Sequence, residues 1–100
     1  MNIEDAVLRA AEMSDNAALV ARPPLTWGAE AIFADLDDDY GVPKYLREAG
    51  YVYLLGKEDL LQLISFTGDK RLSSKSVAEF VIHYALTDAY PSWFDDISSN

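Results

Sequence analysis

The chain contains no cysteine. This absence excludes disulfide bonds, thiolate nucleophiles, sulfur-ligated zinc and iron–sulfur clusters. Histidine occurs once, so any histidine-dependent base or triad would have to use His83. The five glycines are scattered and form no glycine-rich phosphate-binding loop. The sequence therefore holds no complete catalytic set, and we expect a protein that is not an enzyme and that uses no cofactor.

Basic residues are also scarce. There are 8 Lys and Arg against 17 Asp and Glu, which gives a formal net charge of −9 and a pI near 4.3. Nucleic-acid binding gains affinity from Lys and Arg that displace counterions from phosphates, so direct binding to DNA or RNA is disfavoured. The same charge would steer a basic protein partner toward the molecule, more weakly as salt rises. The alternative is that the acidity only keeps the protein soluble.

No uninterrupted apolar segment approaches the length of a membrane span. Residues 1–5 are acidic, whereas a secretory signal begins with basic residues. We therefore expect no membrane association and a cytoplasmic location. With 100 residues, half of them hydrophobic, the chain has the material for one core, and residues 1–100 are expected to form a single domain.

The first half of the chain has three segments with apolar patterns. Residues 3–13 repeat apolar side chains at helical spacing behind the candidate N-cap Asn2, and predict a helix. Residues 17–21 fit either a strand or a helical turn. Residues 29–35 have the apolar centre of a buried strand, which should end at the acidic run that follows.

The second half begins with a short helix predicted from Pro43, as its first residue, to a closing Gly50. Residues 51–55 are rich in β-formers and predict a second strand. The connection is long enough for a crossover helix, so this strand is expected to pair in parallel with residues 29–35.

Two longer helices should follow. One begins at residues 57–59 and ends at Gly68, and the other has capping-box spacing at Ser76 and Glu79. The expected fold class is α+β (mixed α/β), with a small sheet of two or three strands packed by about four helices.

The acidic run after residues 29–35 is the sharpest candidate site, because four carboxylates occur within five residues. Clustered carboxylates suit magnesium or calcium, and the spacing of Asp35 and Asp37 is similar to the nucleophile motif of haloacid-dehalogenase-like phosphatases. The glycine and threonine that normally follow are replaced here by Asp38 and Asp39, and the chain is too short for that fold. Calcium loops of the EF-hand type fail at their diagnostic glycine positions. We therefore expect no metal and interpret the run as a loop that presents charge to a partner.

Aromatic residues could anchor such a partner, since they dominate interface hot spots. Several stand in loop-like positions beside Pro, Gly or Asp, and whether Trp27 and Trp93 are buried stays open. The predicted partner-binding residues are Asp37, Asp38, Asp39, Tyr40, Asp88, Tyr90, Trp93, Asp95 and Asp96.

From about Ala29 onward the sequence resembles a small uncharacterised family of acidic bacterial domains. The matching pieces are the Asp37 to Asp39 run, Val42-Pro43, Gly50-Tyr51, and the stretch from His83-Tyr84 to Asp88-Ala89-Tyr90. Such domains look like the small acidic proteins found beside bacterial toxin genes, where immunity proteins neutralise nucleases. The resemblance carries no established site residues.

Three features point to one function: the net negative charge, the run from Asp37 to Asp39 and the lack of a complete catalytic set. Together they favour an immunity-type or inhibitor-type protein that blocks a basic partner such as a nuclease toxin. One alternative is a small metal-dependent hydrolase or metal-binding module built on Asp35, Asp37 and Asp39. Another is a DNA-mimicking regulator that occupies the nucleic-acid groove of a host protein.

Overall fold

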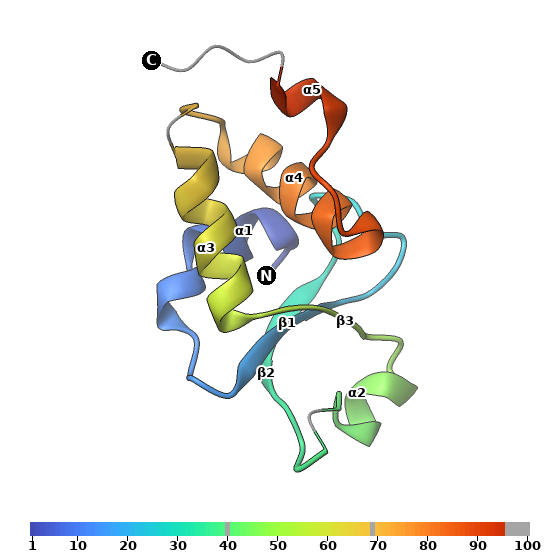
Figure 1. The fold of residues 1–100 in the computed structure, drawn as a ribbon. Helices are drawn as coiled ribbons and strands as arrows, with labels where there is room; N and C mark the ends of the chain where they lie inside the picture. Colours follow the sequence, from blue (N-terminus) through green and yellow to red (C-terminus); the bar gives the residue numbers. More distant parts are fainter. Residues whose placement is uncertain (40, 69, 96–100) are drawn as a thin grey trace.

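The computed structural model describes residues 1–39, 41–68 and 70–95 (Figure 1). The fold is α+β, as predicted, with a three-stranded antiparallel sheet and five α-helices among the described residues. Three of these helices, α1, α3 and α4, cover one face of the sheet, and α2 lies against the other.

The first helix is shorter than predicted. Helix α1 spans Ile3–Leu8, and its capping box joins the side chain of Asn2 to the amide of Asp5 and the side chain of Asp5 to the amide of Asn2. The backbone of Arg9 then leaves the helical region (φ −113°, ψ 12°), and Ala10–Glu12 form a 3-10 turn, η1. The tighter turn still buries Ala10, so the apolar spacing of residues 3–13 reports burial rather than one continuous helix.

Strand β1, Ala17–Ala21, is the central strand, and all five of its residues are buried. It pairs antiparallel with β2, Ala31–Asp35, on one side and with β3, Val52–Gly56, on the other. The predicted parallel pairing of residues 29–35 with residues 51–55 is therefore wrong, because β1 lies between those two strands. Apolar side chains on both faces suit residues 17–21 to the middle of the sheet.

Helix α2, Lys44–Glu48, connects β2 to β3. Pro43 is its N-cap rather than its first residue, and Gly50 closes the turn with a left-handed φ of 94°. Val42 and Leu46 pack with Val20 of β1 to form a small cluster on this face of the sheet.

The main core lies on the other face, beneath α3 (Lys57–Gly68) and α4 (Ser74–Thr87). Ser73, not Ser76, caps α4, since its hydroxyl oxygen accepts from the amide of Ser76. The predicted capping box at Ser76 and Glu79 is therefore wrong by one turn. Helix α5, Ser92–Asp95, buries Phe94 against this core.

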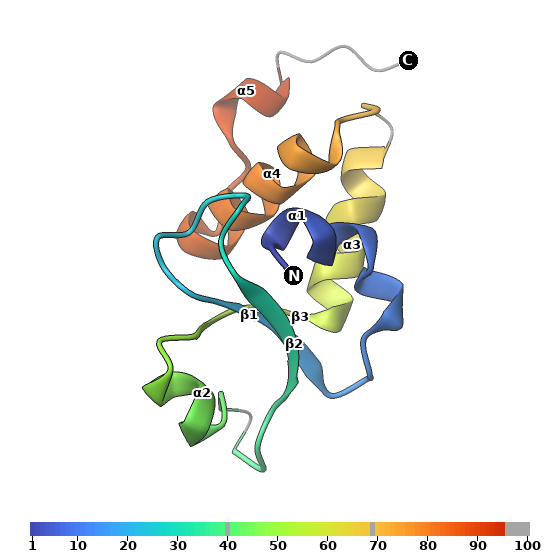
Figure 2. The same ribbon diagram turned by 180° about the vertical axis from the view of Figure 1, so that it is seen from behind.

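The molecule measures 42 × 26 × 23 Å along its principal axes. Both views place α5 at one end and the loop after β2, together with α2, at the other (Figures 1 and 2). No helix within the described ranges is both long and apolar enough to cross a bilayer.

Candidate functional site

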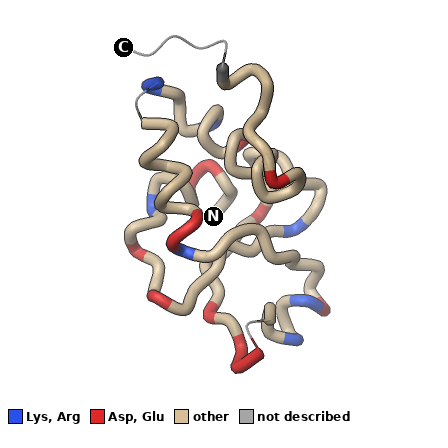
Figure 3. The backbone as a smooth tube through the Cα atoms, viewed as in Figure 1, with Lys and Arg blue, Asp and Glu red and all other residues tan. Residues whose placement is uncertain are grey.

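Three segments meet where β1 begins and where β2 and β3 end. Ala17 pairs with Asp35, and Ala18 pairs with Gly56. The turn before β1, the loop after β2 and the start of α3 therefore lie at the same end of the sheet. They enclose a groove of about 420 Å³, here called the acidic groove. Its lining consists of Asp15, Asn16, Ala17, Leu36, Asp37, Asp38, Gly56, Lys57, Glu58 and Asp59. Figure 3 shows Asp and Glu positions in red along the loop after β2 and at the start of α3, where a blue Lys or Arg position also lies.

The loop after β2 is shaped by Asp37. Its Oδ1 accepts hydrogen bonds from the amides of Asp39 (3.1 Å) and Gly41 (2.8 Å), and its own amide donates to the carbonyl of Gly41 (3.0 Å). These bonds hold Asp38 and Asp39 outward, where both side chains are exposed. The predicted contact residue Tyr40 lies outside the described residues.

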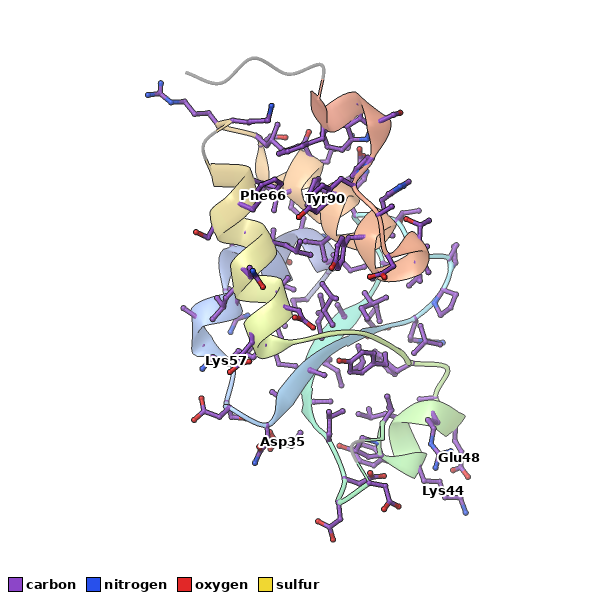
Figure 4. All side chains as sticks on the ribbon, in the orientation of Figure 1. Asp35, Lys44, Glu48, Lys57, Phe66 and Tyr90 are labelled. Atoms are coloured by element: carbon purple, nitrogen blue, oxygen red, sulfur yellow. The ribbon has the colours of Figure 1, made fainter. Side chains whose placement is uncertain are left out.

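The turn before β1 is tied to both neighbouring segments. The hydroxyl of Ser14 donates to Oδ1 of Asp35 at 2.6 Å, and Nζ of Lys57 lies 3.2 Å from Oδ1 of Asp15. Figure 4 shows Asp35 and Lys57 at this end of the sheet. Both contacts are long-range in sequence, so they fix the three segments of the groove relative to one another.

Negative charge dominates the groove. Five carboxylates line it, and among the described residues Lys57 is the one cation in the lining. Glu58 and Asp59 stand in the first turn of α3, where the positive end of the helix dipole stabilises them. The groove is therefore suited to hold positively charged groups.

The carboxylates do not converge on a common point. No set of three or more His, Asp or Glu side chains in the described ranges is arranged to hold a metal ion. Asp35 is bonded to Ser14, and Asp37 is bonded to amides of its own loop. The alternative of a metal-dependent hydrolase built on Asp35, Asp37 and Asp39 gains no support from this geometry.

The predicted contact residues near the C-terminus lie elsewhere. Tyr90 stacks on Phe66 with ring centroids 4.9 Å apart, and Trp93 meets Phe80 edge-on at 6.3 Å. Asp88 is the left-handed C-cap of α4. Figure 4 shows Phe66 and Tyr90 beside each other, away from the end of the sheet at which Asp35 and Lys57 lie.

These aromatic residues therefore do not share a surface with Asp37, Asp38 and Asp39. The side chain of Asp95 and all of Asp96 lie outside the described part of the chain. Of the two tryptophans left open, Trp93 is partly buried in the core, and Trp27 is 36% exposed beneath Nζ of Lys75, which lies 4.7 Å from its ring centroid.

Sequence reasoning missed four charged residues of the groove and one aromatic neighbour. Asp15, Lys57, Glu58 and Asp59 join the site only because β1 is the central strand. Tyr53 of β3 is 48% exposed, and its hydroxyl lies 3.5 Å from the point that a Cβ on Gly56 would occupy. Tyr53 thus lies at the border of the acidic groove, on the side formed by Gly56.

No protein-family model, curated protein or solved structure matches this chain. The functional argument therefore depends on the geometry of the acidic groove.

Proposed function

We propose that this protein is an immunity-type inhibitor that binds a basic protein, such as a bacterial nuclease toxin, and blocks it with the acidic groove. The observation that carries the proposal is that, among the described residues, five carboxylates from three separate segments line one groove together with a single lysine. An acidity needed for solubility alone does not require carboxylates of separate segments to line the same groove.

A nuclease binds the phosphates of its substrate with Lys and Arg side chains. Carboxylates held at one end of a sheet would bind those side chains and exclude the substrate. Long-range attraction would accelerate the encounter, and the exposed ring of Tyr53 would supply a desolvated contact at the groove's border.

The test compares two variants with the same net charge. Asp38→Lys with Asp59→Lys reverses two charges in the groove, and Glu48→Lys with Glu79→Lys reverses two exposed charges outside it. Binding to the basic product of a neighbouring gene is measured by stopped-flow mixing at several salt concentrations. We expect the groove variant to slow association by about tenfold or more at low salt, and the control variant to change it by less than about threefold.

Equal effects of the two variants would mean that only the net charge matters and would overturn the groove as the binding site. A dissociation constant indifferent to salt would count equally against the proposal, because attraction between exposed charges is screened.

A DNA-mimicking regulator would use the same carboxylates against a host protein. In both cases the partner loses its nucleic acid, but a toxin partner is a nuclease whose activity is lost, whereas a host DNA-binding protein has no such activity to lose. A nuclease assay of the partner, alone and with this protein, therefore separates them.

A further inference from the structure

Strand β3 forms one outer edge of the sheet. Its strand partner among the described residues is β1, and in the order β2-β1-β3 its other side carries no strand. Figure 1 shows β3 as the front strand, and Figure 2 shows β2 in front after the half turn. An unpaired edge offers backbone donors and acceptors to an added strand.

The direction of these backbone groups follows from the β1–β2 ladder. The amide of Arg22 donates to the carbonyl of Glu30 at 2.9 Å, just beyond the last ladder pair. Hydrogen-bonded and non-hydrogen-bonded residue pairs alternate along antiparallel strands. The amide and carbonyl of Val20 therefore also point toward β2, whereas those of Ala21 point toward β3. Tyr53 lies opposite Val20. The amide and carbonyl of Tyr53 therefore point away from β1, toward the outer edge.

The side chains do not protect this edge. Val52 is 39% exposed and Tyr53 is 48% exposed, whereas Leu54 and Leu55 are buried. Edges are commonly protected by charged side chains or proline, and β3 has neither. The open part of the edge is thus short and apolar, and it is centred on the outward backbone groups of Tyr53.

The edge leads directly into the acidic groove. Gly56, the last residue of β3, lines that groove, and Glu58 and Asp59 follow within one turn of α3. A strand added along β3 would therefore extend toward carboxylates. This arrangement favours a basic occupant, and it disfavours a second copy of a chain whose net charge is −9.

We propose that the β3 edge binds an extended basic segment of the partner by strand addition, with backbone pairing at Tyr53 and Lys or Arg side chains reaching the acidic groove. The inference rests on the proposed function, because it takes the same partner and adds how that partner is held. Backbone pairing would fix the register of the segment, and the groove would select its charge.

The test compares Tyr53→Pro with Tyr53→Ala. Both variants remove the aromatic ring, but proline also removes the outward amide and obstructs an added strand. Proline is tolerated at edge positions whose amide faces solvent, so the ladder with β1 should survive. Thermal unfolding of both variants checks this.

The probe is a synthetic ten-residue peptide of alternating lysine and threonine, and the control peptide has the same charge with proline at alternate positions. We expect the alternating peptide to bind Tyr53→Pro on the order of tenfold more weakly than Tyr53→Ala, since at least one backbone hydrogen bond and strand register are lost. The proline-containing peptide should not distinguish the two variants.

Equal binding of the alternating peptide to both variants would overturn the inference, as would a wild-type protein that binds the two peptides equally. The Asp38→Lys, Asp59→Lys variant tests the acidic groove separately from strand addition. If this variant binds the alternating peptide as well as wild type does, the acidic groove is not the binding site and the proposed function is overturned. Should Tyr53→Pro not fold, hydrogen exchange decides. The amide of Tyr53 must become protected when the alternating peptide binds wild type, and unchanged exchange would overturn strand addition.

Discussion

The ammonium group of Lys57 lies 3.2 Å from the carboxylate of Asp15, across the acidic groove. The two residues are 42 positions apart in the sequence and join the turn before β1 to the start of α3. The side chain of Lys57 is only 22% exposed, whereas that of Asp15 is 97% exposed. The lysine stem is therefore packed at the groove, and its charge offsets part of the surrounding negative potential.

Lys57→Gln is expected to change stability and binding in opposite directions. Loss of the cation leaves the groove carboxylates repelling one another and should lower the free energy of unfolding by about 0.5–1 kcal/mol. The same loss removes a competitor for the carboxylates and should tighten binding to a basic protein. Denaturant unfolding and a titration with that protein measure the two effects. The control Lys44→Gln removes an exposed charge whose partner Glu48 is 3.8 Å away, and it should change neither value appreciably. Weaker binding of Lys57→Gln would show that this lysine itself contacts the partner.

The bonds of Asp37 predict a difference between two substitutions. Asp37→Ala removes the acceptor for two loop amides and should cost about 1 kcal/mol of stability, whereas Asp37→Asn keeps an acceptor oxygen and should cost less than half of that. Urea unfolding of both variants measures the difference. If the asparagine variant is as unstable as the alanine variant, the negative charge of Asp37 and not its acceptor oxygen shapes the loop.

The elements of the fold were predictable where local chemistry decides them. The N-cap at Asn2 and the left-handed turn at Gly50 follow from a side chain and a glycine acting on their own backbone. The order of strands was not predictable in this way. Residues 17–21 consist of small and branched apolar side chains that suit a strand or a helical turn, and only their pairing on both sides made them the centre of the sheet.

The candidate site depends on that pairing. The loop with Asp37, Asp38 and Asp39 was evident as a run of like charge, but Asp15 and Asp59 join it only through the antiparallel ladder. The same long-range packing stacks the ring of Tyr90 on Phe66 and Phe80, so Tyr90 does not line the acidic groove itself, although it shares a neighbouring pocket with Asp59. Contacts between residues distant in sequence therefore decided which charges and rings gather.

The cluster of aromatic rings around Phe80 should contribute strongly to the stability of the core beneath α4. Phe80 is fully buried and contacts the rings of Phe66, Tyr90, Trp93 and Phe94. Phe80→Ala is expected to lower the free energy of unfolding by about 3–5 kcal/mol, because the cavity adds to the lost burial. Leu86→Ala, on the same helix at 62% exposure, should cost less than about 1 kcal/mol. Guanidinium unfolding measures both, and similar losses would mean that α4 does not pack as the structure describes.

Tyr51 predicts how stability changes in alkali. Partial burial of its ring, followed by the negative charge of Glu30, raises the pKa of the Tyr51 phenol above its ordinary range. Because the folded pKa exceeds the unfolded one, the contribution of this group is fully present below about pH 10 and is lost as the pH rises through the folded pKa.

Tyr51→Phe cannot ionise, so its stability should fall less steeply with pH above about pH 10 than that of wild type. Glu30→Gln removes one of the two causes and should give an intermediate slope. Urea unfolding at a series of alkaline pH values measures all three proteins, and ultraviolet absorbance of the phenolate follows the ionisation directly. Identical slopes for wild type and Tyr51→Phe would show that the fold does not disfavour the ionised Tyr51, and that neither partial burial nor Glu30 acts on it as the structure implies.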